Sequence, residues 1–330
     1  MKVSKKVLFI DHWPGIDSLH ACGAGLGSSL FKLAALADVS DAGFEVHLLT
    51  SPAKKELLED AAGIDFIYSK PVSAKYSSFE KIINWGIADD QFPDEIKKLP
   101  NFHPFSQDDR TLYKSTAHLT FWRHFAAAAL KLPVPVRKSK IDICIESEDM
   151  LKAAKLMPDK FIWIAISYQS VSPLKDYKNW TAVIEALLEA DERIRIVLLG
   201  DRQENFTGSE RVLNMMGGTS IQLLKALISQ TDLLLGVDGL STNIAMSLNI
   251  PSVILFTMIS PEHVIADLKT DKIIALSTGN CPYQFCYSEL VNYRSSACRL
   301  LAESADIKNP ECLNFTPESI VTQVLKLLKG

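Results

Sequence analysis

The stretch 217–257, GGTSIQLLKALISQTDLLLGVDGLSTNIAMSLNIPSVILFT, constrains the fold more than any other part of the chain. Its pattern predicts an amphipathic helix, a buried strand over 232–237, a short polar loop, a second helix and a buried strand over 251–256. A buried parallel strand that leads through a polar loop into a helix is where open α/β sheets bind ligands, because the free N–H groups at the helix start face an anion. From spacing alone, an ordinary βαβ crossover without a ligand is an equal alternative.

The same alternation of strand and helix runs through both halves of the chain. Strands are predicted over 7–11, 45–50, 64–69, 141–145, 161–167, 193–200 and 272–276. We therefore expect an α/β protein with two Rossmann-like, doubly wound parallel-sheet domains that face a cleft.

The weaker pattern between these strands sets the expected domain limits. The N-terminal domain is predicted over 1–150, with an irregular insertion over about 74–132 that is rich in aromatic residues and contains two or three helices. The C-terminal domain is predicted over 151–315, and a terminal helix over 316–330 completes the chain. Thr316 and Pro317 suit an N-cap followed by proline in the first helical turn.

The charge and the apolar content exclude some classes of protein. The net charge of −4 and the isoelectric point near 6.0 argue against a nucleic-acid partner. No apolar run approaches the roughly 18 residues of a membrane span, so no transmembrane segment is expected. The N-terminal MKVSKKVLFID is too short in its apolar part for a signal peptide and reads as a first strand, which favours a cytoplasmic location.

Three elements of the second half carry a family resemblance. Their residues are Lys178 and Trp180 after the strand at 161–167, Gly200, Asp201 and Glu204 after the strand at 193–200, and Asp238, Ala245, Pro251 and Phe256 within 217–257. In these elements the stretch 161–257 resembles glycosyltransferase family 9, the heptosyltransferase-type enzymes. The resemblance implies a GT-B fold, a nucleotide-sugar donor bound by the C-terminal domain, and a last helix that packs back on the N-terminal domain.

The resemblance also implies the residues of the donor site. Lys178 would bind the diphosphate as a point charge, and Gly200 and Glu204 would lie near the nucleotide. Asp238 would contact sugar hydroxyls or cap the following helix, since a carboxylate repels a diphosphate. The helix start would add Ser241, Thr242 and Asn243. The family pattern has histidine where this chain has Asn243, and an amide cannot carry a proton.

The N-terminal half departs further from the family pattern. The glycine loop contains Gly25 and Gly27, and Ser28 stands where the family has the aspartate proposed as the base. An unassisted serine hydroxyl is no base at neutral pH. Residues on the preceding loop are the candidates instead: Asp11, Asp17 and His20 for the base, with His12, Gly25, Gly27 and Ser28 forming an acceptor-side loop. The alternatives are a loop that only clamps the acceptor, or a loss of catalysis.

Four of the six cysteines lie close together near the C-terminus. Cys281, Cys286, Cys298 and Cys312 could supply four thiolates to a structural zinc or iron ion, and the spacing does not distinguish the two metals. Some protein-directed members of the family carry a similar four-cysteine iron-binding element. Independent thiols or a single redox pair are the alternatives.

The resemblance therefore implies a glycosyltransferase that needs no cofactor for catalysis. It would move a sugar, with heptose as one candidate, from a nucleotide-diphosphate donor to an acceptor hydroxyl with inversion. An ADP-sugar is the favoured donor, and the acceptor would be a glycan, a lipid-linked sugar or a protein, in lipopolysaccharide, glycan or protein glycosylation. The alternatives are a catalytically inactive nucleotide-sugar-binding homologue and another GT-B enzyme such as an epimerase.

Overall fold

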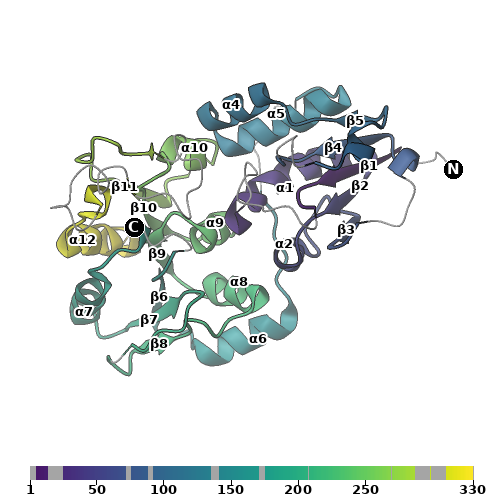
Figure 1. Ribbon diagram of the computed structural model, residues 1–330. Helices are drawn as coiled ribbons and strands as arrows, with labels where there is room; N and C mark the ends of the chain where they lie inside the picture. The colour runs from purple at the N-terminus through teal and green to yellow at the C-terminus, as the bar shows by residue number, and fades with distance from the viewer. Residues whose placement is uncertain are drawn as a thin grey trace. The chain divides into compact units, whose positions relative to one another are not determined.

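The chain folds into two compact units. The computed structural model describes residues 5–13, 25–71, 76–87, 92–134, 141–170, 175–206, 208–268, 270–286, 298 and 310–329. Unit 1 is Met1–Cys144 with Glu262–Lys269, and unit 2 is Ile145–Pro261 with Thr270–Gly330 (Figure 1). The main boundary lies six residues before the predicted one, at 144 instead of 150, and the segment 262–269 was not expected in the first unit.

Unit 1 is built on a five-stranded parallel sheet of order β3-β2-β1-β4-β5. Its strands are β1 (Lys5–Ile10), β2 (Phe44–Leu49), β3 (Phe66–Tyr68), β4 (Lys81–Asn84) and β5 (Phe102–His103). In this sheet β1 pairs with β2 on one side and with β4 on the other, although β3 separates these two strands in the sequence. The segment 74–132 was predicted as an irregular insertion with two or three helices. Helices do form there, but the segment also supplies β4 and β5, so it is part of the sheet and not an insertion.

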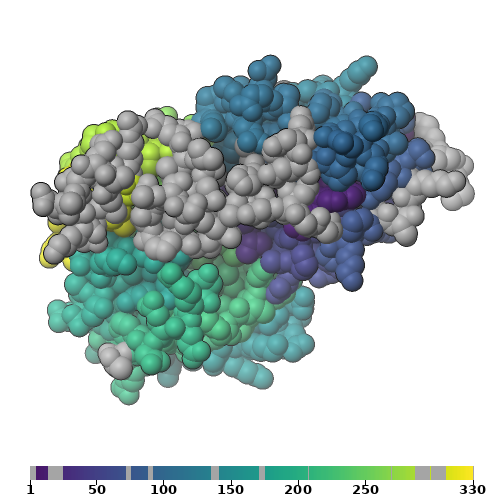
Figure 2. Space-filling model, in the orientation of Figure 1, coloured from purple at the N-terminus to yellow at the C-terminus, as the bar shows by residue number. Residues whose placement is uncertain are grey.

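Helices and aromatic side chains cover both faces of this sheet. The helices of unit 1 are α1 (Leu26–Asp41), α2 (Pro52–Leu58), α3 (Asp94–Lys97), α4 (Gln107–Ser115) and α5 (His118–Leu130), and α10 (Pro261–Ile265) belongs to it from its second residue on. Leu8 and Ile10 of β1 pack with Phe92 and Ile96 on one face. Phe9 of β1 meets Trp85, which stacks on Trp122 of α5. Residues 92–134 form the upper surface of this unit in the view of Figure 2.

Unit 2 is built on a six-stranded parallel sheet of order β11-β10-β9-β6-β7-β8. Its strands are β6 (Ile162–Ser167), β7 (Ile194–Leu199), β8 (Val212–Asn214), β9 (Leu233–Val237), β10 (Ser252–Leu255) and β11 (Ile273–Leu276). The two buried strands predicted within 217–257 are β9 and β10. Strand 141–145 was predicted but does not form, since those residues have no regular secondary structure and only Ile141 of them is buried.

The helices of unit 2 are α6 (Ser147–Leu156), α7 (Trp180–Ala190), α8 (Ile221–Ser229), α9 (Leu240–Ser247) and α12 (Pro317–Lys329). The terminal helix α12 lies beside α7, and its Ile320 and Val324 are fully buried in the core of unit 2 (Figure 1). The helix thus contributes to the core of unit 2, and the expectation that it also packs back on the N-terminal domain stays a prediction. Within the described residues, no helix combines the length and the apolar content that crossing a membrane requires.

Candidate functional site

The centre of the second sheet holds a topological switch point. From β6 the chain continues to β7 and β8 on one side, while β9, β10 and β11 lie on the other side. The loops that follow β6 and β9 thus leave the carboxyl edge in opposite directions, which opens a crevice in α/β sheets. The strands approach closely here, since a Cβ added at Gly236 of β9 would lie 2.6 Å from the Cβ of Ser167 of β6.

Lys175 and Asp238 join the two loops beside this point. Asp238 follows β9 and is 4 % exposed. The Lys175 ammonium, from the loop after β6, donates to Oδ2 of Asp238 and to the Asp238 carbonyl oxygen at 2.6 Å. Burial raises the pKa of Asp238, while Lys175 and the backbone amides of Asp238 and Thr257 act against that rise. The pair therefore places a partly buried cation at the carboxyl edge of the sheet.

Buried polar atoms without a partner gather at the same edge. Oδ1 of Asp238, Oγ1 of Thr257 and Nε2 of Gln169 have no hydrogen-bond partner among the described residues. Asp238 directly follows β9, while Thr257 and Gln169 lie two residues after β10 and β6. Buried polar groups in proteins are nearly always hydrogen-bonded, so three such atoms at neighbouring strand ends indicate a place for a polar ligand.

A second network ties the loop after β6 to the loop after β7. The Gln169 side-chain carbonyl accepts the Arg202 N–H at 2.9 Å, and the Arg202 guanidinium donates to Asp176 at 2.7 Å. The other oxygen of Asp176 accepts the Ser170 N–H at 2.8 Å. A Cβ at Gly200 would lie 2.6 Å from the Gln169 side-chain oxygen, so a larger residue there would force the Gln169 side chain to shift.

The N-terminus of α9 is capped by the side chain of Thr242 from its own first turn. The Thr242 hydroxyl accepts the Gly239 N–H and donates to the Gly239 carbonyl, both at 2.9 Å. Its hydrogen-bonding capacity thus serves the helix cap and not a phosphate, contrary to the expected role. Ser241 and Asn243 lie buried in the same first turn.

The predicted donor residues are only partly brought together. Gly200, Asp238, Ser241, Thr242 and Asn243 lie at or next to the ends of β7 and β9, whereas Lys178 and Glu204 are exposed side chains on the adjoining loops. Lys175, Asp176, Gln169 and Thr257 were not predicted. Lys175 lies only three positions before Lys178 in the same run, and the pattern offered no reason to prefer it.

In unit 1 the switch point lies between β1 and β4 and holds a buried ionic cluster. Asp11 follows β1, and its two carboxylate oxygens accept hydrogen bonds from Lys32 of α1 and from Lys54 of α2, the latter at 2.6 Å. Thr50 donates to the same carboxylate at 3.1 Å. Lys32 also donates to the Trp85 carbonyl at 2.9 Å and lies 4.4 Å from the centre of the Trp122 ring.

This cluster decides the protonation state of Asp11. Burial alone would raise the pKa of Asp11, but the charges and hydrogen bonds of Lys32 and Lys54 outweigh it and lower the pKa to about 2. A carboxylate so strongly stabilised in its charged form is a poor proton acceptor at neutral pH. The expected role of Asp11 as a base thus conflicts with its contacts, which make it the counter-ion of two buried lysines.

The remaining acceptor-side residues have varied surroundings. His12 is half-buried, and burial followed by the charge of Lys54 lowers its pKa, so its imidazole is neutral at pH 7. Gly25 is the N-cap of α1, and Gly27 and Ser28 lie in its first turn. The candidates Asp17 and His20 lie outside the described residues.

The four cysteines of the C-terminal region influence one another. Cys281 and Cys312 are buried, and Cys286 and Cys298 are half-buried. Burial raises the pKa of Cys312 to about 12, and charges on Cys281, Cys298 and Cys286 add to this rise. Among the described residues, however, no three histidine, cysteine or acidic side chains are arranged to hold a metal ion.

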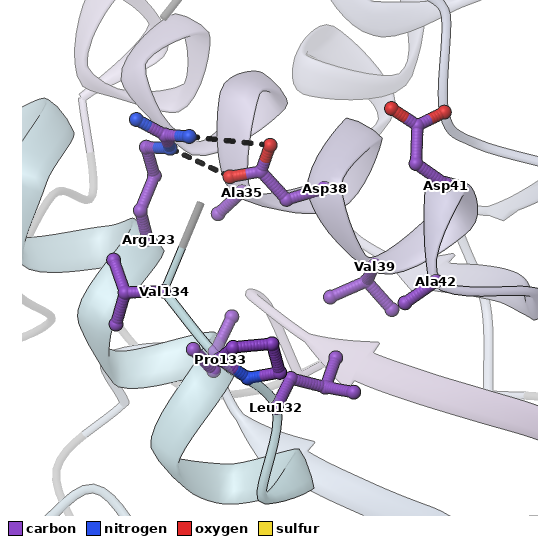
Figure 3. A pocket seen from close by; sticks show the side chains of 11 residues that line it. Ala35, Asp38, Val39, Asp41, Ala42, Arg123, Leu132, Pro133 and Val134 are labelled. Carbon is purple, nitrogen blue, oxygen red and sulfur yellow. Dashed lines mark hydrogen bonds and ion pairs between the residues drawn. The ribbon is translucent and has the colours of Figure 1, made fainter. Parts of the chain in front are cut away.

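A cavity of about 290 Å³ lies elsewhere in unit 1, between α1 and α5. Arg123 and Asp38 point toward each other at one end and are joined by a hydrogen-bonded ion pair of 2.6 Å, while Leu132 and Pro133 line another side (Figure 3). None of the residues predicted from the sequence lines this cavity.

Comparisons with known proteins agree with the two-sheet architecture. The family model described as glycosyltransferase family 9 (heptosyltransferase) matches residues 103–290, more than half of the chain. A comparison with the curated proteins finds no match in sequence.

Several solved structures resemble the whole chain. A glycosyl transferase family 9 protein from Veillonella parvula is 13 % identical over 100 % of this chain and 99 % of its own, with a TM-score of 0.67. The ADP-heptose lps heptosyltransferase II of E. coli is 12 % identical over 98 % of both chains, with a TM-score of 0.63. The iron-containing dodecameric glycosyltransferase TibC of enterotoxigenic E. coli is 13 % identical over 100 % of this chain and 77 % of its own, with a TM-score of 0.63. At these identities the likeness establishes the fold, GT-B with two parallel-sheet domains.

Proposed function

The chain belongs to glycosyltransferase family 9, and on that premise we propose that it transfers a sugar from a nucleotide-diphosphate donor to an acceptor hydroxyl with inversion. The observation that carries the proposal is the cluster at the switch point of unit 2. There a cation, Lys175, and the unpartnered polar atoms of Asp238 and Thr257 lie at the carboxyl ends of neighbouring strands. A diphosphate needs the cation, and a sugar ring needs the hydrogen-bonding oxygens.

The donor residues of this proposal follow the strand ends. Gly200 and Glu204 would lie near the nucleotide, Lys178 near the phosphates, and Asp238 against sugar hydroxyls. Ser241, Thr242 and Asn243 would contribute through the helix start, with Thr242 acting by holding the cap in place. An ADP-sugar is the favoured donor and heptose a candidate sugar, in keeping with the description of the E. coli relative as an ADP-heptose heptosyltransferase.

The acceptor half of the proposal rests on fewer contacts. His12, Gly25, Gly27 and Ser28 would form the acceptor-side loop, and the acceptor would be a glycan, a lipid-linked sugar or a protein. Because the charge of Asp11 is held by two lysines, we assign the proton from the acceptor hydroxyl to Asp17, His20 or the neutral imidazole of His12. We further propose a cytoplasmic reaction in lipopolysaccharide, glycan or protein glycosylation.

We also propose a structural zinc or iron ion for the cysteines, with no metal in catalysis. Cys281, Cys286, Cys298 and Cys312 would hold the ion as thiolates, and a bound cation would offset the burial and the neighbouring charges that raise the pKa of Cys312. The description of the relative TibC as iron-containing is consistent with iron.

A second candidate is a homologue that binds a nucleotide sugar without turning it over. Two observations favour it: Asp11 is engaged in ion pairs, and Asn243 cannot exchange a proton. Donor binding would then persist while transfer is lost.

Thermal-shift and mass-spectrometric measurements with ADP- and GDP-sugars test these proposals together. We expect a shift with an ADP-sugar, its slow hydrolysis, and loss of the shift in Asp238→Ala. Glu189→Ala, which changes an exposed acid on α7 of the same unit, is the matched control and should behave as wild type. Binding without hydrolysis or transfer would favour the second candidate, and no shift with any nucleotide sugar would reject both.

A further inference from the structure

The two lysines of the loop after β6 stand in different environments. Lys175 has a side chain only 12 % exposed, and its ammonium binds both the carboxylate and the carbonyl oxygen of Asp238. Lys178 is exposed, ahead of α7. The cation at the carboxyl edge of the sheet is therefore Lys175.

Asp176, the residue after Lys175, fixes the backbone of this loop through its own hydrogen bonds. Asp176 accepts the Ser170 N–H at 2.8 Å and pairs with Arg202 at 2.7 Å. Adjacent residues thus reach in opposite directions, Lys175 to the loop after β9 and Asp176 to the loop after β7. This arrangement fixes the position of the Lys175 backbone and leaves its flexible side chain as the part that can move.

The two oxygens of the Asp238 carboxylate differ in their side-chain contacts. Oδ2 accepts from Lys175, while Oδ1 is buried without a partner among the described residues. Thr257, whose backbone amide acts on this carboxylate, also carries a buried hydroxyl without such a partner. A carboxylate oxygen and a hydroxyl at the ends of two paired strands are suited to the hydroxyl groups of a sugar, which donate and accept hydrogen bonds.

We propose that Lys175 and Asp238 form a latch that distinguishes a sugar-diphosphate donor from the nucleoside diphosphate left after transfer. The inference rests on the function proposed above. In the free protein Lys175 neutralises Asp238. When a donor binds, the ammonium turns to the diphosphate, and the Asp238 carboxylate keeps hydrogen bonds by accepting from sugar hydroxyls together with Thr257. A nucleoside diphosphate without a sugar draws Lys175 away but leaves a buried carboxylate unpaired, which is unfavourable.

The latch has a consequence for turnover. Once the sugar has left, the Asp238 carboxylate competes with the diphosphate product for the same ammonium, and this competition weakens product binding. The donor is therefore held more tightly than the product, although both carry the same diphosphate.

Calorimetric titrations with ADP, AMP, pyrophosphate and the ADP-sugar that gives the largest thermal shift test the latch. Lys175→Met should weaken ADP and pyrophosphate about tenfold and AMP by no more than about twofold, because a charge-assisted hydrogen bond is lost. Lys175→Arg keeps the charge and should retain ADP binding. Lys155→Met, which changes an exposed lysine on α6, is the matched control.

In Asp238→Asn, the direction of the change in ADP affinity distinguishes the latch from a purely structural role of Asp238. With the competing carboxylate removed, ADP should bind several-fold more tightly than to wild type, while the advantage of the ADP-sugar over ADP should shrink. A purely structural role for Asp238 would weaken both ligands.

The following results in the variants would overturn the latch. They are equal losses of ADP and AMP affinity in Lys175→Met, weaker ADP binding in Asp238→Asn, and a selective ADP loss in Lys178→Met that Lys175→Met does not show. If wild type binds neither ADP nor pyrophosphate, the proposed function fails and the latch with it. ADP binding that is insensitive to Lys175→Met overturns the latch alone.

Discussion

At the scale of single residues, Asp11 is best understood through the two lysines that it neutralises. Lys32 and Lys54 are 2 % and 3 % exposed, and both bind its carboxylate. In Asp11→Asn the two buried ammonium groups lose their counter-ion. We expect the free energy of unfolding to fall by about 3–5 kcal/mol, as when one partner of a buried pair is removed. Urea denaturation of the purified variant measures this change.

The matched control for that variant is Glu59→Gln. Glu59 pairs with Lys55 at 3.7 Å, and both side chains are well exposed, so its loss should change the stability by less than about 1 kcal/mol. If Asp11 were instead the catalytic base, Asp11→Asn would fold with the stability of wild type and lose only turnover. That outcome would contradict the structural role assigned to it.

The position of a site residue was predictable where the local alternation of strand and loop determines it. Asp238 directly follows an apolar strand, so its position at the strand end could be foreseen. Lys32 and Lys54 could not, because each lies on a helix where lysine is usually solvated, and their burial depends on strands distant in the sequence. Lys175 was missed for the same reason, since its contact with Asp238 spans 63 positions.

At the scale of elements, long apolar strands were predictable and short ones were not. The apolar runs that form β9 and β10 are buried throughout, and a continuous apolar run predicts a buried parallel strand. By contrast, β5 has two residues and β8 three, too few to show a period. The segment 74–132 therefore looked irregular, although β4 and β5 complete the sheet of unit 1.

The turn at residues 281–286 carries two of the four clustered cysteines, and the metal content of the purified protein tests the proposed site. Its Gln284 N–H donates to the Cys281 carbonyl at 3.1 Å, and the Phe285 N–H donates to the Thr257 carbonyl at 3.1 Å, so the turn is attached to the end of β10. We expect about one zinc or iron ion per chain in protein purified without chelator, measured by elemental analysis. Cys281→Ser and Cys312→Ser should each lose the ion, because a structural site of this kind uses all four thiolates.

Cys144→Ser is the control for that measurement. Cys144 is an exposed free thiol outside the cluster, and its replacement should leave the metal content unchanged. Metal-free protein with four thiols that react independently with a thiol reagent would contradict the proposed site.

At the scale of the whole molecule, the chain returns to unit 1 after most of unit 2 has been built. Residues Glu262–Lys269 belong to unit 1, where the Asp267 carboxylate accepts the Thr120 N–H at 3.0 Å and His263 stacks on His118. No local pattern marks this return, because the helix α10 has only five residues. The alternation of strands and helices was sufficient for the fold class but not for this exchange between units.

The buried His118, which contacts His263 of the returning segment, is expected to make the stability of unit 1 depend on pH. His118 is buried between Tyr113 and Phe31, and burial, followed by the charge of His263, lowers its pKa from 6.5 to about 3. Between these values the unfolded chain binds a proton that the folded chain does not, so the stability falls as the pH drops, by ~1.4 kcal/mol per pH unit. Asp11 adds a further loss between its unfolded pKa of 3.8 and its folded pKa of about 2. In unit 2 the raised pKa of Asp238 acts in the opposite direction.

Hydrogen exchange followed by mass spectrometry can resolve the two units. On going from pH 7 to pH 5, after correction for intrinsic exchange rates, we expect peptides from α1 and β2 to lose protection equivalent to ~2 kcal/mol. Peptides from β9 and β10 should lose much less. His118→Phe keeps the ring stacking and should abolish most of the loss in unit 1, whereas His124→Gln, at an exposed position on the same helix, should not. An equal loss of protection in both units, or a loss that persists in His118→Phe, would show that acid acts through other groups.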